Sequence, residues 1–527
     1  MKRILLLLCL SFLTRIGIQA APEIIYSQPD GELRIYNRNG KTVKADEEGT
    51  LITGDQEGSM SIVYASAGVV YLQDPVSGYT MSGSWVKGTL STDGRTITIP
   101  LGQYIDYTRS FDIAYQLQIL NYDSTNDTYV LDESATEVTY TLDDEGGIRL
   151  NDTSDQRILG LIFHPFGNPQ GAAIGQDFMY LDQQWIGEGD YESSYTLMDI
   201  QAQQPPSDME TRLYYATSAE YDGAAYYPYS GTVHIGRDAD DVWIQGISRL
   251  LPSAWIRGTM QADGKILFPT GQFMGTVEGI ALFMHGATLN EENSFNIKDV
   301  EMVIEDDEYI TYDFVFVTTS QNSLQYVNFY MGATLSPEEE RPTEAPNGLQ
   351  TQSYTLTHAD GNRKVGAAQS DGEFYIQGIW EGLPTAWVKG TVESGTITFA
   401  MPQYLGTYDD EGIDYPIYFT AFDAKTGQML RQLTFDYDAE TGTLSSASSP
   451  IAISINKTGY LSVQDYYFPT LVCDTNAIED IAAPADASEA ITYDLGGRKV
   501  SPTHKGILVR ETRQPDGTRK VSKIVKR

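Results

Sequence analysis

The pentapeptide Trp-Val-Lys-Gly-Thr at residues 85–89 occurs twice more in the chain, as Trp-Ile-Arg-Gly-Thr at 255–259 and as Trp-Val-Lys-Gly-Thr at 387–391. In each copy a short aromatic segment precedes the tryptophan, and a Thr- or Ile-rich segment and a Gln–aromatic pair follow it. The aromatic residue lies 14, 12 and 12 residues before the tryptophan, at Tyr71, Trp243 and Tyr375. Self-similarity of this length predicts three copies of one structural unit.

Each copy has the pattern of antiparallel β-structure. Short runs rich in Val, Ile, Thr and aromatic residues are separated by turn pairs such as Asp93-Gly94, Asp263-Gly264 and Ser394-Gly395. We count about eight short strands per unit and find no long amphipathic helix. The sequence therefore predicts an all-β protein of three tandem meander units, each a small barrel or sandwich. A six-bladed propeller, built from three double units, is the alternative.

Composition shifts divide the chain. Lys2 and Arg3 precede a short apolar run, and Ala20 and Ala21 follow it, which is typical of an export signal. Stretches rich in Pro and Glu separate the units, as expected of solvated linkers. The predicted segments are a signal peptide (1–20), three β units (21–200, 201–335 and 336–473), an acidic linker (474–490) and a basic C-terminal module (491–527).

The overall charge excludes some function classes. The 527 residues include 72 Asp or Glu and 35 Lys or Arg, a formal net charge of −37. Such a chain repels phosphate backbones, so we expect no nucleic-acid partner. The N-terminal apolar run is too short to span a bilayer and no other stretch approaches the length required, so we expect no transmembrane segment.

Signs of catalysis are weak. The five His are scattered, and the chain has no metal-binding His pair, no nucleophile motif and no phosphate-binding glycine loop. We therefore expect no enzyme and no cofactor. The acidic composition allows weak Ca²⁺ binding, but the nearest approach to a calcium loop, at Asp436, Asp438 and Glu440, has its glycine one place late at Gly442.

Strand periodicity predicts a shared outer face in the three units. Because side chains alternate along a strand, Val86 and Gly88 are expected to face the core, and Trp85, Lys87 and Thr89 the other side. Aromatic rings stack on sugars, amides bind hydroxyls, and cations bind acidic groups. The candidate ligand-binding residues are Tyr71, Gln73, Trp85, Lys87, Trp243, Gln245, Trp255, Arg257, Tyr375, Gln377, Trp387 and Lys389.

This face favours a non-catalytic protein that binds a glycan or another extracellular polymer. Two alternatives remain open at this point. Duplication of one fold repeats its structural residues as well, so the protein could be a purely structural or adhesive surface protein. The third class is a polysaccharide-active enzyme, since paired carboxylates are abundant in this chain.

The C-terminal segment has the opposite charge to the body. From Tyr493 onward it contains ten Lys or Arg and three acidic residues. Its segments 493–500, 505–509 and 520–527 resemble, in order, the C-terminal sorting domain of type IX secretion in Bacteroidetes. The family's usual Gly-Ile-Tyr is Gly506-Ile507-Leu508 here.

That resemblance implies a small β module that addresses the protein to the secretion machinery of the outer membrane. It implies a location at the cell surface or outside the cell, or in the periplasm if the tail does not act as a sorting signal. The repeated units also resemble uncharacterised secreted β-repeat proteins of the same bacteria, which implies no function.

Overall fold

The computed structural model describes residues 23–526 except for several short segments. These exceptions are residues 47–48, 78–82, 109–112, 166–183, 222–225, 291–293, 360, 411, 425–428, 446–448, 459–460, 468, 475–488, 495–498, 501–505 and 514–518. The predicted signal peptide and nearly all of the predicted acidic linker lie outside the described residues. Within the described residues the chain is all-β, as predicted, with one short 3₁₀ turn, η1 (Ser66–Gly68).

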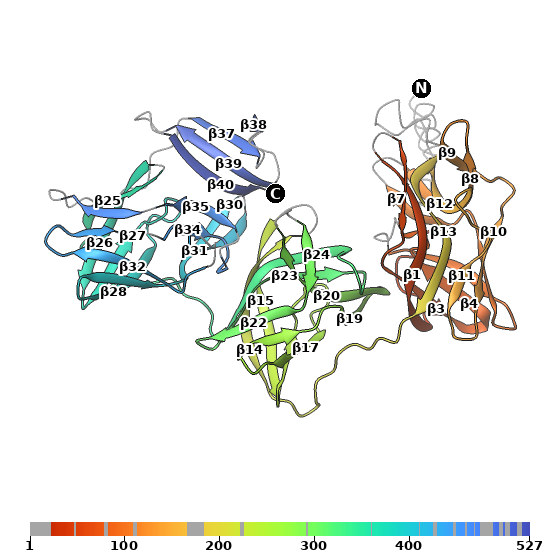
Figure 1. Cartoon of the computed structure of the whole chain (residues 1–527), viewed down its shortest axis with the longest axis horizontal. Coiled ribbons are helices and arrows are strands. Elements are labelled where there is room, and N and C mark those ends of the chain that lie inside the picture. Colours follow the sequence, from red (N-terminus) through yellow and green to blue (C-terminus); the bar gives the residue numbers. More distant parts are fainter. Residues whose placement is uncertain are drawn as a thin grey trace, which may run out of the picture. The chain divides into compact units, whose positions relative to one another are not determined.

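The first β unit forms a 13-stranded antiparallel sheet (Figure 1). Its strands are β1 (Glu32–Ala45), β2 (Leu51–Asp55), β3 (Ser59–Tyr64), β4 (Val69–Gln73), β5 (Trp85–Leu90), β6 (Thr96–Pro100), β7 (Tyr104–Thr108), β8 (Ile113–Asp123), β9 (Thr128–Leu131), β10 (Glu137–Leu142), β11 (Ile148–Leu150), β12 (Arg157–Pro165) and β13 (Trp185–Leu197). The sheet closes on itself, because β1 pairs with β13. The closed ring runs β1-β3-β4-β5-β6-β10-β11-β13.

The second unit forms an 11-stranded sheet with the same kind of ring. Its strands are β14 (Thr211–Tyr221), β15 (Tyr226–Asp238), β16 (Asp241–Gln245), β17 (Trp255–Met260), β18 (Ile266–Phe268), β19 (Gln272–Val277), β20 (Ile280–Leu289), β21 (Phe295–Lys298), β22 (Val300–Glu305), β23 (Glu308–Thr318) and β24 (Tyr326–Ser336). Pairing of β24 with both β14 and β23 closes the ring.

The third unit contains a closed barrel, β25-β26-β27-β28-β29-β32-β33-β36, and a four-stranded sheet, β30-β31-β34-β35. The strands are β25 (Gln352–His358), β26 (Gly361–Ser370), β27 (Glu373–Gln377), β28 (Trp387–Glu393), β29 (Thr396–Ala400), β30 (Gln403–Asp410), β31 (Ile413–Ala421), β32 (Gln432–Asp438), β33 (Thr443–Ser445), β34 (Ile451–Ser454), β35 (Ser462–Tyr466) and β36 (Thr470–Cys473).

The three rings follow one plan. Each is an up-and-down meander of eight strands, with two or three further strands inserted after the fifth ring strand. The first meander is also interrupted by β2 and β12, and the third by β34 and β35. Closure leaves the ring strands no free edge, which removes a site of unwanted strand pairing. Each ring is thus a sheet closed on itself, which favours small barrels over four-stranded propeller blades. The inserted strands make each unit larger than the eight strands counted from the sequence.

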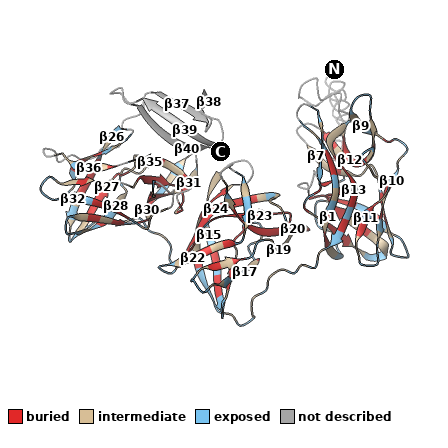
Figure 2. Ribbon diagram, viewed as in Figure 1, coloured by how far each residue is buried: buried red, intermediate tan, exposed pale blue. Residues whose placement is uncertain are grey.

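Alternating side chains fill the inside of the first ring. Its buried cluster includes Val70 and Leu72 of β4, Val86 of β5 and Ile97 and Ile99 of β6. Buried and exposed residues alternate along the strands in Figure 2. A closed ring of eight strands is just wide enough for side chains to fill it.

The C-terminal segment contains β37 (Glu489–Asp494), β38 (Lys499–Val500), β39 (Gly506–Arg513) and β40 (Arg519–Lys526). They pair antiparallel in the order β38-β37-β39-β40. Its likeness to a sorting domain stays a prediction from the sequence.

Candidate functional site

The predicted residues of each unit come together on two neighbouring strands. In all three units the glutamine pairs across from the tryptophan, and the upstream aromatic residue pairs across from the cation. The pairs are Gln73–Trp85 and Tyr71–Lys87, Gln245–Trp255 and Trp243–Arg257, and Gln377–Trp387 and Tyr375–Lys389. We call these three four-residue faces the Trp ledges. Directly opposed side chains are close enough to act on one ligand.

On the strand that carries the tryptophan the burial pattern follows the predicted phase, whereas the preceding strands β16 and β27 bury three residues in succession. In β5, Val86 and Gly88 are buried whereas Lys87 and Thr89 are exposed, and β17 and β28 have the same alternation. Val86 belongs to the barrel core, and Trp85 does not. The Trp ledges therefore lie on the outside of the barrels.

The glycine of the pentapeptide is explained by the neighbouring strand. A Cβ built on Gly88 would lie 2.2 Å from Ile99 Cδ1 and 2.6 Å from the Thr98 carbonyl oxygen. A Cβ on Gly258 or Gly390 would lie 2.8 Å from an isoleucine methyl group of the next strand. A side chain at this position would overpack the core, so the recurrence of glycine has a structural cause.

A glutamine that recurs in all three units binds the backbone of the strand that carries the tryptophan. No role for this glutamine was predicted from the sequence. The Oε1 atom of Gln103 accepts a hydrogen bond from the Lys87 N–H (2.8 Å), and its Nε2 donates to the carbonyl oxygens of Lys87 (2.9 Å) and Pro100 (2.8 Å). The same three bonds join Gln272 to Arg257 and Pro269, and Gln403 to Lys389 and Ala400. We call this set of three bonds in each unit the glutamine clip. The signal in the sequence was the near-constant separation of 16, 15 and 14 residues.

The chain segment before each barrel is bound to its tryptophan. Isolated β-bridges join Ile25 to Trp85, Gln203 to Trp255 and Thr343 to Trp387. In the second and third units this segment is the predicted Pro-rich linker, which is thus anchored through a backbone contact at the ledge. This fixes the start of the tryptophan strand in every unit.

The first ledge is closed to solvent. Trp85 is 1% exposed and Gln73 is 3% exposed. The turn at Glu278–Gly279, which joins β19 to β20, covers them. Although β19 and β20 pair with the second sheet, residues 273–283 form one compact unit with the first barrel. Gln73 Nε2 donates to the Glu278 carbonyl oxygen (2.8 Å), and a Cβ on Gly279 would lie 2.3 Å from the Trp85 ring. Trp85 therefore offers no surface to a ligand in this structure.

The second ledge keeps a half-buried indole at Trp255. Beside it, Arg257 lies 5.6 Å from the ring centroid of Trp243 and forms an ion pair with Asp241 (2.7 Å). Trp243 is only 6% exposed. Trp255, Gln245 and Arg257 are thus the accessible members of this ledge.

The third ledge has a half-buried indole at Trp387, whose ring lies 6.3 Å from that of Tyr375 in an edge-on contact. Tyr375 is 5% exposed, and its hydroxyl donates to Glu373. Lys389 also binds Glu373 (3.1 Å). These hydrogen bonds lower the pKa of Glu373, and the bond to Glu373 raises the pKa of Tyr375 to about 12. At neutral pH, Glu373 is therefore a carboxylate anion and Tyr375 a neutral phenol.

Other hollows in the described part of the chain lie away from the Trp ledges. A groove of about 930 Å³ in the first unit follows β11 and the end of β13, and a cleft of about 420 Å³ lies in the second unit. A third cavity, lined by Tyr229, Ile247 and Tyr330, has about 10 Å³ of free space, which holds one water at most. That interior cavity is too small for a ligand.

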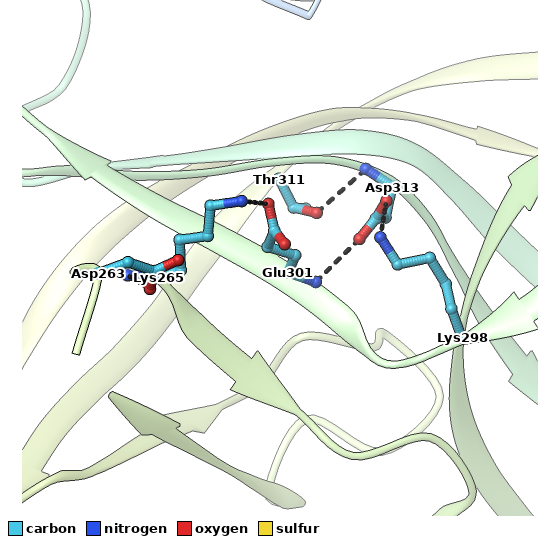
Figure 3. Close-up of polar contacts among 6 residues, drawn as sticks. All are labelled: Asp263, Lys265, Lys298, Glu301, Thr311 and Asp313. Carbon is cyan, nitrogen blue, oxygen red and sulfur yellow. Dashed lines mark hydrogen bonds and ion pairs between the residues drawn. The ribbon is translucent and has the colours of Figure 1, made fainter. Parts of the chain in front are cut away.

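One acidic cluster of the second unit is occupied by the chain's own lysines and backbone. In the second unit, Asp313 accepts hydrogen bonds from Lys298 Nζ (3.0 Å) and the Glu301 N–H (2.8 Å), while Lys265 binds the Glu301 carboxylate (2.7 Å) (Figure 3). No group of three or more His, Cys, Asp or Glu among the described residues is arranged to hold a metal ion.

The predicted calcium-like segment in the third unit has a local role. Asp438 Oδ1 accepts a hydrogen bond from the Glu440 N–H (2.9 Å), and this bond lowers the pKa of Asp438. The carboxylate thus caps its own turn, a common use of Asp in loops.

A buried carboxylate with a raised pKa is the best acid–base candidate among the described residues. Burial raises the pKa of Asp190, which accepts hydrogen bonds from the Ser77 N–H (2.7 Å) and hydroxyl (2.6 Å). Asp190 is fully buried and holds the loop that follows β4. Without access to solvent, it is a structural group rather than a catalytic one.

No protein-family model and no curated protein matches this chain. Among the described residues, no helix has the length and apolar character needed to cross a membrane.

Proposed function

We propose that the protein is exported and binds an extracellular glycan, without catalysis, through the Trp ledges of its second and third units. The half-buried indoles of Trp255 and Trp387 carry this proposal. Each lies directly across from a glutamine, so a ring face and an amide adjoin at one point of the outer surface. A sugar ring can stack on an indole while its hydroxyls bind the amide.

The neighbouring cations are held in place beside these indoles. Arg257 and Lys389 each bind a carboxylate on the adjacent strand, and the glutamine clip fixes the backbone that carries them. A rigid surface loses little conformational entropy when it binds a ligand. Each ledge therefore fits part of an extended, hydroxyl-rich polymer. Two such sites on one protein would bind the same polymer more tightly than either site alone.

Export is the second part of the proposal, and it rests on the N-terminal apolar run and the basic C-terminal segment. We propose delivery by the type IX route to the cell surface or the medium. A protein at the surface that is purely structural is the second candidate, favoured by the coverage of Trp85, because there the ledge serves to hold the chain's own turn.

A glycan array tests the binding proposal. The wild-type chain is compared with the double variant Trp255→Ala/Trp387→Ala and with Lys87→Ala as a control, since the first ledge is closed. We expect the double variant to lose the signals that the wild type and Lys87→Ala share. Equal signals for all three proteins would remove the ledges as binding sites, and no signal for the wild type would favour the structural alternative.

A further inference from the structure

The cleft in the second unit has a lining unlike the rest of this acidic protein. It has a volume of about 420 Å³, within the range of small-molecule sites. It lies between β14, β15 and the turn that joins β22 to β23. Its polar and aromatic lining residues are Glu210, Arg212, Tyr214, Arg237, Asp307 and Tyr309.

Two tyrosine rings hold the two arginines of the cleft. The guanidinium carbon of Arg212 lies 5.4 Å from the ring centroid of Tyr214, and that of Arg237 lies 5.4 Å from the ring centroid of Tyr309. Arg237 Nε also donates to the Tyr309 hydroxyl (2.9 Å).

The rings themselves are fixed. They meet edge-on at 5.3 Å and are 7% and 4% exposed. A guanidinium held against a buried ring is ordered before a ligand arrives, and its remaining N–H groups can bind a planar anion in two-point fashion.

Neither arginine of the cleft is neutralised by a carboxylate within ion-pair distance among the described residues. The other two arginines of the second unit have such partners, since Arg249 pairs with Glu220 and Arg257 with Asp241. Both Arg212 and Arg237 are exposed. In a chain with twice as many acidic as basic residues, two cations without a carboxylate partner in one cleft point to an anionic ligand group.

The carboxylates of the cleft narrow the ligand class. Glu210 and Asp307 line the same space as the arginines. They accept hydrogen bonds from hydroxyl groups but repel a second anion. The lining therefore matches a ligand that carries one carboxylate and several hydroxyls.

We propose that this cleft binds a uronic acid residue of an acidic saccharide. The sugar carboxylate takes the N–H groups of Arg212 and Arg237, and the ring hydroxyls donate to Glu210 and Asp307. The site is separate from the Trp ledges, so either proposal can fail alone.

Calorimetric titration of the full chain with digalacturonate tests the proposal, with neutral galactobiose as the matched probe. We expect digalacturonate to bind at least about tenfold more tightly than galactobiose, because hydrogen bonds to a charged group are the strong ones. Arg212→Ala and Arg237→Ala each weaken digalacturonate binding by at least about tenfold. Arg212→Lys keeps the charge but loses the planar fork, so it gives an intermediate loss.

Two controls separate this site from other sources of binding. Arg149→Ala removes an exposed cation from the groove of the first unit and leaves the affinity unchanged. The double variant Trp255→Ala/Trp387→Ala is titrated as well, and Arg212→Ala should weaken digalacturonate binding by the same factor in that background as in the wild type.

Some outcomes would overturn the proposal. One is equal affinity of the wild type and Arg212→Ala for digalacturonate, and another is equal affinity of the wild type for the acidic and neutral disaccharides. Arg212→Ala tests the proposal even if Arg237→Ala unfolds. Arg237 donates a hydrogen bond to the hydroxyl of the buried Tyr309, whereas the contact of Arg212 is with the face of the Tyr214 ring.

Discussion

Replacement of Gln272 by Glu tests the role of the glutamine clip. The amide of Gln272 accepts a hydrogen bond from the Arg257 N–H (2.9 Å) and donates to the carbonyl oxygens of Arg257 (3.0 Å) and Pro269 (3.1 Å). The substitution keeps the size and the acceptor. It turns the donor into an oxygen that faces two carbonyl oxygens.

The magnitude follows from the two lost donor bonds. Each hydrogen bond contributes about 1 kcal/mol net, so the variant loses about 2 kcal/mol of unfolding free energy in the second unit. For a unit of this size, that lowers its melting temperature by roughly 6 °C. The carbonyl oxygens also raise the pKa of the new carboxyl group above its ordinary value of about 4.3. Protonation of this carboxyl group restores one donor. The loss of unfolding free energy is therefore full above its pKa in the folded state and becomes smaller as the pH falls below that pKa.

Scanning calorimetry of the full chain measures the effect, because a chain of several units gives several transitions. One transition should move in Gln272→Glu while the others stay. The matched control is Gln261→Glu in the same unit, which removes one local bond to the Thr259 carbonyl oxygen (3.0 Å). Equal melting profiles for the two variants and the wild type would refute the clip as a stabilising device.

Three further outcomes are expected in unfolding experiments. Gly88→Ala should lower the free energy of unfolding by about 3 kcal/mol and Gly390→Ala by about 1 kcal/mol, as measured by urea titration. Of the two added Cβ atoms, only the one at position 88 would lie less than 3.0 Å from a backbone oxygen; equal losses would contradict this. Trp85→Ala should lower the free energy of unfolding by about 3–5 kcal/mol, and Trp387→Ala by clearly less, because Trp85 is fully buried and Trp387 is not; the reverse order would show that the first ledge is open. Hydrogen bonds from a lysine, a threonine and a serine lower the pKa of Asp474, so Asp474→Asn should lower the free energy of unfolding at neutral pH by about 1 kcal/mol or less and have no effect in acid, below the folded pKa; an equal difference at both pH values would exclude the carboxylate as the cause.

The strand phase could be predicted from the sequence because it depends on neighbouring residues alone. The alternation of Val86 and Gly88 with Lys87 and Thr89 is local, and it placed the ledge residues on one outer face. Ring closure depends on pairs such as Tyr36 with Leu197, which are far apart in the chain. Periodicity carries no information about such partners, which is why barrel and propeller both remained open.

The coverage of Trp85 was beyond sequence reasoning for a related cause. Glu278 and Gly279 lie about two hundred residues from the ledge that they cover, and the longer spacing of 14 residues before Trp85, against 12 before Trp255 and Trp387, gives no indication of a covering turn. The arginine cleft was missed as well. Arg212 and Arg237 lie on neighbouring strands, but only the fold reveals the tyrosine rings that they contact.

The glutamine clip could have been found earlier. The three copies have a glutamine at the same place, directly before an aromatic residue: Gln103, Gln272 and Gln403. A polar residue that repeats with the fold, at the end of a strand, is a candidate for a backbone contact as much as for a ligand contact.

The accessibility of the three ledge tryptophans can be measured directly by fluorine NMR of the chain labelled with 5-fluorotryptophan. The six tryptophan signals are assigned by single replacements with Phe and followed while a saccharide chosen from the array is added. Our account predicts that the signals of Trp255 and Trp387 shift and that the signal of Trp85 stays in place. A shift at Trp85, or unchanged signals at both Trp255 and Trp387 while the saccharide binds, would contradict it.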